Sequence, residues 1–139
     1  MKSLTKNLIF FAALFLFGAI FFRLGLSHFL ENRNYSIVWL IAIFYFIYNF
    51  VMGWIFGKRD HESLPLFDIG FRFHFVSYLL FNMVSLLWFL LELNSQYENI
   101  GVVYTTAIVW GFFVGGHYIL YLIAQKHAIN GINKEEIFD

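Results

Sequence analysis

Apolar residues run along this chain in four long blocks that are separated by short polar interruptions. The blocks cover residues 8–30, 36–56, 71–93 and 100–124. Each has about the 20 residues that a membrane-spanning helix needs. Short breaks after the first and third blocks make neighbouring helices antiparallel. The sequence therefore predicts an all-α integral membrane protein with four transmembrane helices arranged as two hairpins, over residues 1–57 and 71–139, joined by a cytoplasmic linker over residues 58–70.

Composition supports a membrane protein and excludes several other classes. Of the 139 residues, 60% are hydrophobic and only 13% are charged, whereas an ordinary soluble domain is about a quarter charged. Zero net charge gives no reason to expect nucleic acid as a partner. The chain has no cysteine, which excludes disulfides and thiolate metal sites. No recognisable catalytic spacing of residues is present, so we expect no enzyme activity, no catalytic residues, no metal and no bound cofactor.

The distribution of Lys and Arg predicts the orientation in the membrane. Positive residues favour the cytoplasmic side of short loops. They gather at the N-terminus, in the linker and in the C-terminal tail, whereas the first loop has Arg33 alone and residues 94–99 have none. The residues on the predicted cytoplasmic side are Lys2, Lys6, Lys58, Arg59, Lys126 and Lys134. Both termini and the linker should therefore be cytoplasmic.

Two polar ladders interrupt the third and fourth apolar blocks. His74, Tyr78 and Asn82 follow one another at steps of four, and His117 comes seven residues after the pair Trp110-Gly111. Steps of four and seven keep side chains on one face of a helix. A polar group that faces lipid without a partner is costly. The two ladders should therefore face each other, or a ligand, and not lipid.

The histidines of these ladders have two interpretations. The favoured one is hydrogen bonding between helices, with His74 bonded to Tyr78 or Asn82 and His117 to a backbone carbonyl. The other is a shared site for haem, for a metal or for a proton relay. Two histidines alone form a poor metal set, so His74, Tyr78, Asn82 and His117 are predicted as a polar network or ligand site.

Small residues predict where helices approach closely. Gly53 and Gly57 are four residues apart near the end of the second block, and Gly111 and Gly115 have the same spacing in the fourth. Such spacing lets two membrane helices pack backbone to backbone. We therefore predict helix packing at these four glycines.

Arg23 is a charge inside the first apolar block. It should either snorkel to the headgroups, which is the favoured interpretation, or pair with a carboxylate. Glu92 is the expected partner, with Glu31 as the local alternative. Asp68 and Arg72 are four residues apart and should form a local pair at the start of a helix.

The two ladders resemble the bacterial two-transmembrane domain family. The matching residues are Phe71-x-x-His74-x-x-x-Tyr78-x-x-x-Asn82 and, after a short loop, Trp110-Gly111-x5-His117, with an acidic tail at Lys134-Glu135-Glu136-Ile137. The resemblance covers residues 69–138, half of the chain. It implies a helical hairpin that occurs alone or fused to signalling modules, and a place in the bacterial inner membrane. The chain departs from the family at Phe113, where a second glycine is usual, and it carries no kinase or DNA-binding module.

The function predicted on this basis is a small, non-enzymatic sensory or accessory module that acts through helix–helix contacts. Its partners would be the lipid bilayer and either further copies of itself, as a homo-oligomer, or a partner membrane protein. One alternative is a transport subunit that handles a cofactor such as haem, a small ligand or protons at the histidines. The other is an oligomeric, pore-forming effector.

Overall fold

A computed structural model describes residues 5–61 and 66–130 of the chain. In that part it consists of four helices and no strand: α1 (Lys6–Glu31), α2 (Tyr35–Asp60), α3 (Leu66–Leu90) and α4 (Ile100–Asn130). All four are long and apolar enough to cross a membrane. The predicted all-α class and the two hairpins are confirmed, and the four apolar helices are consistent with a membrane protein.

The helix boundaries differ from the predicted ones at both sides of the linker. Residues 58–60 belong to α2 and residues 66–70 to α3, so most of the expected linker is helical, while Pro65 lies outside the described residues. Lys58 and Arg59 occupy the last turn of α2 and Asp68 the first turn of α3. Each charge is favourable at its helix end, because the helix dipole is negative at the C-terminus and positive at the N-terminus.

The two helices that enter hairpin turns end in the same backbone motif. After α1, Arg33 adopts a left-handed φ of 54°, and the N–H of Asn34 reaches back to the carbonyl of Phe29 at 2.8 Å. After α3, Glu92 has a φ of 57°, and the N–H of Leu93 reaches the carbonyl of Trp88 at 3.0 Å. This is the Schellman motif, which satisfies carbonyls at the end of a helix. Because α3 ends at Leu90, Glu92 lies in the turn and not in the helix.

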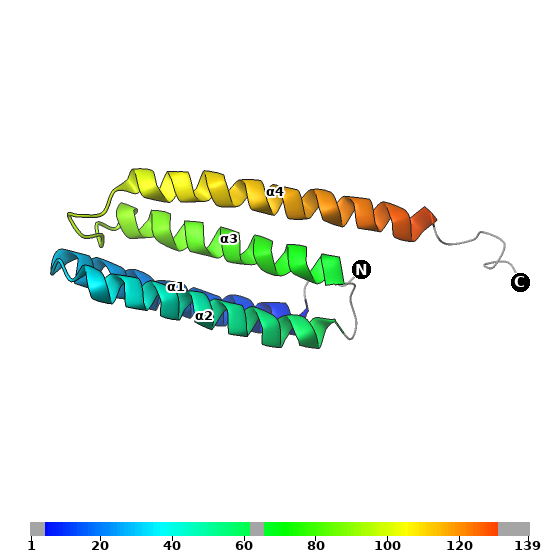
Figure 1. Cartoon of the computed structure of the whole chain (residues 1–139), viewed down its shortest axis with the longest axis horizontal. Coiled ribbons are helices and arrows are strands. Elements are labelled where there is room, and N and C mark those ends of the chain that lie inside the picture. The colour runs from blue at the N-terminus through cyan, green and yellow to red at the C-terminus, as the bar shows by residue number, and fades with distance from the viewer. Residues whose placement is uncertain (1–4, 62–65, 131–139) are drawn as a thin grey trace, which may run out of the picture.

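The four helices are nearly parallel rods, with α3 between α4 on one side and α1 and α2 on the other (Figure 1). Both hairpin turns lie at one end of the molecule, the hairpin end. The start of α1, the end of α2, the start of α3 and the end of α4 lie at the other, the termini end (Figure 1). Helix α1 packs on α2 and α3, whereas α4 packs on α3 alone among the described helices.

Helix α4 therefore lies at one side of the molecule, against α3 (Figure 1). In the described part of the chain, the backbone of α4 comes close to that of α3 but not to that of α1 or α2. The physical reason lies in the faces of α4 that point away from α3, where most of the exposed side chains are apolar. Lipid tails are as apolar as leucine, so a membrane offers such a helix little driving force to bury its remaining faces.

The core lies along one stripe of α1. Its buried residues follow at steps of three or four and are apolar toward the termini end but polar toward the hairpin end. They are Leu8, Phe11, Phe15, Ala19, Arg23 and Ser27. Phe11 meets Phe73 of α3 with ring centroids 4.7 Å apart, and Phe22 stacks on Tyr45 of α2 at 4.5 Å.

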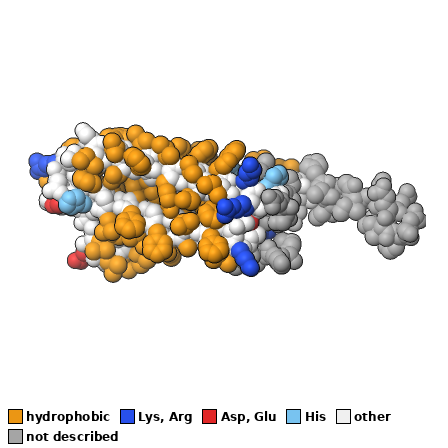
Figure 2. Space-filling view, turned by 90° about the horizontal axis from the view of Figure 1, so that it is seen from below, with side chains coloured by type: hydrophobic (Ala, Val, Ile, Leu, Met, Phe, Trp, Pro, Cys, Tyr) orange, Lys and Arg blue, Asp and Glu red, His pale blue; other side chains and the backbone are white. Residues whose placement is uncertain are grey.

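Outside this core the surface is apolar over most of its length. Hydrophobic side chains cover the middle of the molecule and charged ones gather at its two ends (Figure 2). On α2, Trp39 is 72% exposed and Trp54 is 68% exposed, near opposite ends of the helix. Aromatic rings at two such levels are typical of the headgroup belts of membrane proteins.

Candidate functional site

The predicted polar ladders meet between α3 and α4. The indole N–H of Trp110 donates a hydrogen bond to Nε2 of His74. The His74 and His117 rings lie edge to face with their centroids 4.7 Å apart. The Tyr78 ring meets Trp110 edge to face at 5.9 Å. The stripes of the two helices therefore face one another.

Hydrogen-bond chemistry places a proton on Nδ1 of both histidines. An indole N–H can only donate, so Nε2 of His74 accepts and its proton lies on Nδ1. Nδ1 of His117 lies 2.9 Å from the carbonyl oxygen of Phe113, which can only accept, so this proton is also on Nδ1. His117 is exposed, and its Nε2 bonds to no described residue.

One predicted bond of this network is wrong and one is present. His117 bonds to a backbone carbonyl of its own helix, as expected. His74 bonds to Trp110 and not to Tyr78 or Asn82. The reason is geometric: side chains one and two turns along the same helix point parallel to His74, whereas Trp110 points toward it from the facing helix.

Asn82 makes its one described hydrogen bond within α3 and none to α4. It is buried, and its amide donates to the carbonyl of Tyr78 at 2.8 Å, within its own helix. Its Oδ1 has no hydrogen-bond partner among the described residues. The cluster between the helices, called the histidine cluster below, thus consists of His74, Tyr78, Trp110 and His117.

The histidine cluster does not have the geometry of a haem or metal site. Rings with centroids 4.7 Å apart are in contact, so no porphyrin plane fits between His74 and His117. Nε2 of His74 also accepts a hydrogen bond where a metal ligand would need a free lone pair. No group of three or more potential metal ligands occurs among the residues that the structure describes.

A groove of about 1180 Å³ opens beside this cluster, between α2 and α4. Its floor is formed by α3 and by two phenylalanines of α1, and its walls by α2 and α4. Three members of the histidine cluster, His74, Trp110 and His117, line it. The groove exists because α4 packs on α3 alone and leaves α2 uncovered on this side.

A second polar cluster, at the hairpin end, was not anticipated in this form. Nη2 of Arg23 lies 2.6 Å from Oε2 of Glu98, and both side chains are only 5% exposed. Ser27 donates to the other oxygen of Glu98, and Trp88 donates its indole N–H to Ser27 at 2.9 Å. The Arg23 guanidinium also lies 5.5 Å from the centre of the Phe89 ring. A buried arginine thus has a charged partner and aromatic neighbours.

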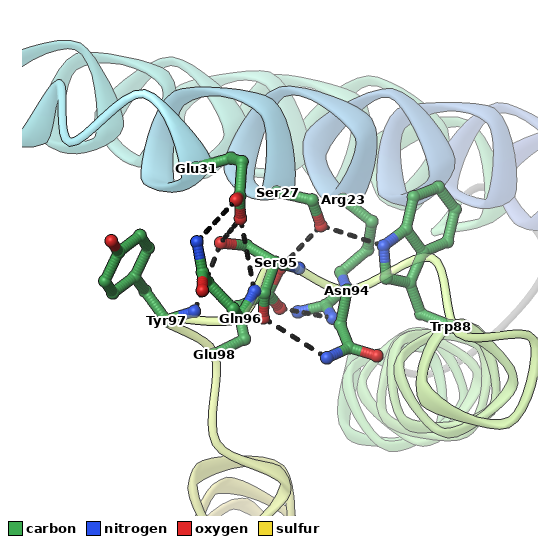
Figure 3. Close-up of polar contacts among 9 residues, drawn as sticks. All are labelled: Arg23, Ser27, Glu31, Trp88, Asn94, Ser95, Gln96, Tyr97 and Glu98. Atoms are coloured by element: carbon green, nitrogen blue, oxygen red, sulfur yellow. Dashed lines mark hydrogen bonds and ion pairs between the residues drawn. The ribbon is translucent and has the colours of Figure 1, made fainter.

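The same cluster fastens the turn between α3 and α4 onto α1. Glu31 accepts hydrogen bonds from the Ser95 hydroxyl at 2.6 Å and from the Gln96 side chain at 2.8 Å. Figure 3 shows Arg23, Ser27 and Glu31 pointing from α1 toward this turn. Figure 3 also shows that Trp88 approaches the same group of residues from α3. The contacts join the first hairpin to the second.

The predicted partners of Arg23 are therefore wrong. It neither snorkels nor pairs with Glu92, because α3 ends two residues before Glu92, which is exposed in the turn. Glu98 lies further along the turn, which folds back over α1. One signal in the sequence indicates this cluster: Arg23, Ser27 and Glu31 are spaced at four, like the ladder on α3.

The predicted glycine contacts divide into two groups. A Cβ at Gly111 would lie 3.3 Å from the Tyr78 hydroxyl, and one at Gly57 would lie 3.6 Å from the Ile69 side chain. A Cβ at Gly53 or Gly115 would meet nothing within 4 Å among the described residues. Close packing within the chain is therefore absent at these two positions, because Gly53 lines the groove and Gly115 faces away from α3.

Gly18, which was not predicted as a packing site, marks the tightest approach. A Cβ there would lie 2.7 Å from Cε1 of Tyr48, whose hydroxyl donates to the carbonyl of Leu14 at 2.9 Å. The contact joins α1 and α2. No other glycine lies four residues before or after Gly18, so the sequence has no small-residue motif there and did not predict this contact.

Polar contacts also fix the termini end. The buried carboxylate of Asp60 accepts hydrogen bonds from the side chains of Thr5 and Asn7, which joins the end of α2 to the start of α1. The predicted local pair of Asp68 and Arg72 is confirmed at 2.7 Å. Both groups lie where their helices end or begin.

Comparisons with protein-family models, with curated proteins and with solved structures found no match to this chain. The resemblance to the bacterial two-transmembrane domain family therefore stays a prediction.

Proposed function

We propose that this protein is a small multi-pass membrane protein, without enzyme activity, that acts as a sensory or accessory module by docking against another transmembrane helix. The family resemblance supports a place in the bacterial inner membrane. The charge pattern supports a cytoplasmic termini end, with Lys6, Lys58, Arg59 and Lys126 on that side and Arg33 alone at the other. Lys2 and Lys134, which extend the pattern, lie outside the described residues.

The face of α4 opposite α3 is the observation that carries this proposal. Ile108, Phe112, Gly115 and Ile119 follow one another at steps of three or four, so they share one face of the helix. The three apolar side chains are 58–78% exposed, and open space surrounds both Gly115 and Gly116. We call this stripe the outer face of α4.

A helix with small residues in the centre of a bare apolar face is suited to close contact with a second helix. Membrane helices associate through van der Waals packing, which small residues permit by letting two backbones approach. Among the residues that the structure describes, nothing approaches the outer face of α4 closely enough to use those glycines. A transmembrane helix of a second copy or of a different protein would use them.

Photo-crosslinking in the membrane tests the proposal. The chain has no cysteine, so a single cysteine introduced at Phe112 can carry a photoreactive group. We expect a protein adduct from Phe112, and no adduct from the matched position Phe44, which is 69% exposed on α2. An adduct at twice the mass of the chain identifies a homo-oligomer, and any other mass identifies a partner protein.

The substitution Gly115→Leu makes the test specific. Because a Cβ at Gly115 would meet no described residue within 4 Å, the variant should keep its thermal stability in detergent. It should nevertheless lose the Phe112 adduct, since the leucine side chain would hold the docking helix away. Equal adducts from Phe112 and Phe44, or an adduct that survives Gly115→Leu, would refute docking at this face.

A further inference from the structure

The groove between α2 and α4 changes in chemistry along its length. At the termini end it is lined by Lys58 and His61 of α2, and next by His74 and His117. Further toward the hairpin end its lining is aromatic, with Phe22, Phe46 and Phe81 among the residues concerned. No described Asp or Glu lines it. The groove therefore offers a lysine ammonium and imidazole groups at one end and a largely apolar surface beyond them.

From these features we propose that the groove binds one anionic phospholipid from the leaflet at the termini end. Its phosphate would lie at Lys58 and His61, and one acyl chain would run along the aromatic floor. The inference goes beyond the proposed docking function, because the groove and the outer face of α4 are different surfaces. Either can fail without the other.

The dimensions of the groove suit an acyl chain. Its lining on α2 extends from Ala42 to His61, which at about 1.5 Å per residue corresponds to ~28 Å. One leaflet contributes about half of the ~30 Å hydrocarbon core, so a chain anchored at Lys58 fits within the groove. Its volume of about 1180 Å³ exceeds the range of roughly 300–1,000 Å³ that is usual for compact small-molecule sites.

The polar side chains at the termini end of the groove favour a negatively charged lipid headgroup. Lys58 is exposed and supplies an ammonium with three donors at the end of the membrane span. The imidazole of His61 lies one turn further along α2, on the same wall of the groove. Because no described carboxylate on the groove wall offsets these groups, a lipid with net negative charge is favoured over a zwitterionic one.

Two groove variants separate headgroup recognition from chain binding. Lys58→Gln combined with His61→Gln removes the ammonium and the imidazole, and Arg59→Gln is the matched control, because Arg59 lies over the Phe56 ring and does not line the groove. Gly53→Leu places a side chain inside the groove, at a position where a Cβ would meet no described atom within 4 Å. Its control is Gly116→Leu, which adds the same side chain to α4 outside the groove.

The experiment measures lipid binding to the purified full chain by native mass spectrometry and by thermal shift in detergent, with phosphatidylglycerol and phosphatidylcholine as probes. We expect one tightly held phosphatidylglycerol per chain, bound about fivefold more tightly than phosphatidylcholine, as the attraction of one basic residue suggests. The Lys58/His61 double variant should lose the preference, Gly53→Leu should lose both lipids, and the two controls should behave like the wild type.

Several outcomes would overturn the proposal. Equal binding of the two lipids by the wild type would mean that the groove merely borders bulk lipid. Unchanged phosphatidylglycerol binding in Gly53→Leu would place the lipid elsewhere. Inorganic phosphate that shifts the melting temperature as much as phosphatidylglycerol would show a headgroup site without chain binding. A lipid-free dimer that Gly53→Leu dissociates would show that a second copy fills the groove.

Discussion

At the scale of single residues, tight packing in this protein depends on positions that have no motif around them. Gly18 lies against the edge of the Tyr48 ring, where a Cβ would come within 2.7 Å of a ring carbon. That ring is held in place by the hydrogen bond from its hydroxyl to the carbonyl of Leu14. A side chain at Gly18 would therefore force the ring or the helix to move.

We predict that Gly18→Ala destabilises the protein by about 1–3 kcal/mol, the usual cost of overpacking. The measurement is thermal unfolding in detergent. Gly115→Ala is the control, since it adds the same methyl group to open space. A loss at Gly115 equal to that at Gly18 would show that the cost comes from helix flexibility and not from the contact with Tyr48.

At Glu92, the backbone conformation of a single residue lowers the stability of the folded protein. It is exposed and adopts a φ of 57°, in the region that glycine occupies without strain. A left-handed conformation costs other residues roughly 1–2 kcal/mol. Glu92→Gly should therefore raise the stability in urea or on heating by about 0.5–1 kcal/mol, after the entropy that glycine loses on folding. Glu92→Ala keeps the strained backbone and should give no such gain, so an equal gain from both variants would point to removal of the charge.

At the scale of helices, polar side chains join α4 to α3, α2 to α1 and the first hairpin to the second. Trp110 and His74 join α4 to α3, Tyr48 joins α2 to α1, and Arg23 and Ser27 join α1 to the turn that follows α3. Between these points the helix contacts are apolar and carry little information about register. The polar residues therefore specify which faces of the helices meet.

The contact between His74 and Trp110 can be measured with a double-mutant cycle. His74→Leu and Trp110→Phe should each destabilise the protein, and their combined cost should be smaller than the sum by roughly 0.6–1.7 kcal/mol, the range found for hydrogen bonds between membrane helices. Ser77→Ala with Trp110→Phe is the additive control, because the Ser77 hydroxyl bonds to the carbonyl of Phe73 in its own helix. Strict additivity of the His74 and Trp110 variants would mean that the two side chains do not interact in solution.

At the scale of the whole molecule, the ion pair of Arg23 and Glu98 connects the two hairpins. Both groups are buried, so removal of one leaves the other as an uncompensated charge. We predict that Arg23→Met costs about 3–5 kcal/mol and that Glu98→Gln also destabilises. The double variant should cost less than Arg23→Met alone, because it leaves no unpaired charge in the interior. Unfolding of the three variants in detergent is the measurement, and a double variant that costs the full sum would contradict a direct pair.

Orientation in the membrane is the second prediction at this scale. Reporter fusions at the N-terminus, after His61 and at the C-terminus should all report the cytoplasmic side, because the positive residues cluster there. A fusion within residues 94–99 should report the opposite side. A cytoplasmic signal from that turn would contradict the arrangement of four spans.

The sequence alone determined the number and the antiparallel arrangement of the helices, because long apolar blocks and short breaks leave few alternatives. It also brought His74 and His117 together, because steps of four and seven place polar groups on one helix face. It did not determine the partner of Arg23 or the close approach at Gly18, since both depend on where a turn or a ring from another helix lies. Only the tertiary structure decided that α4 leaves a groove beside α2, because the polar stripe of α4 marks the face that meets α3, whereas its other, apolar faces carry no mark of whether they will pack.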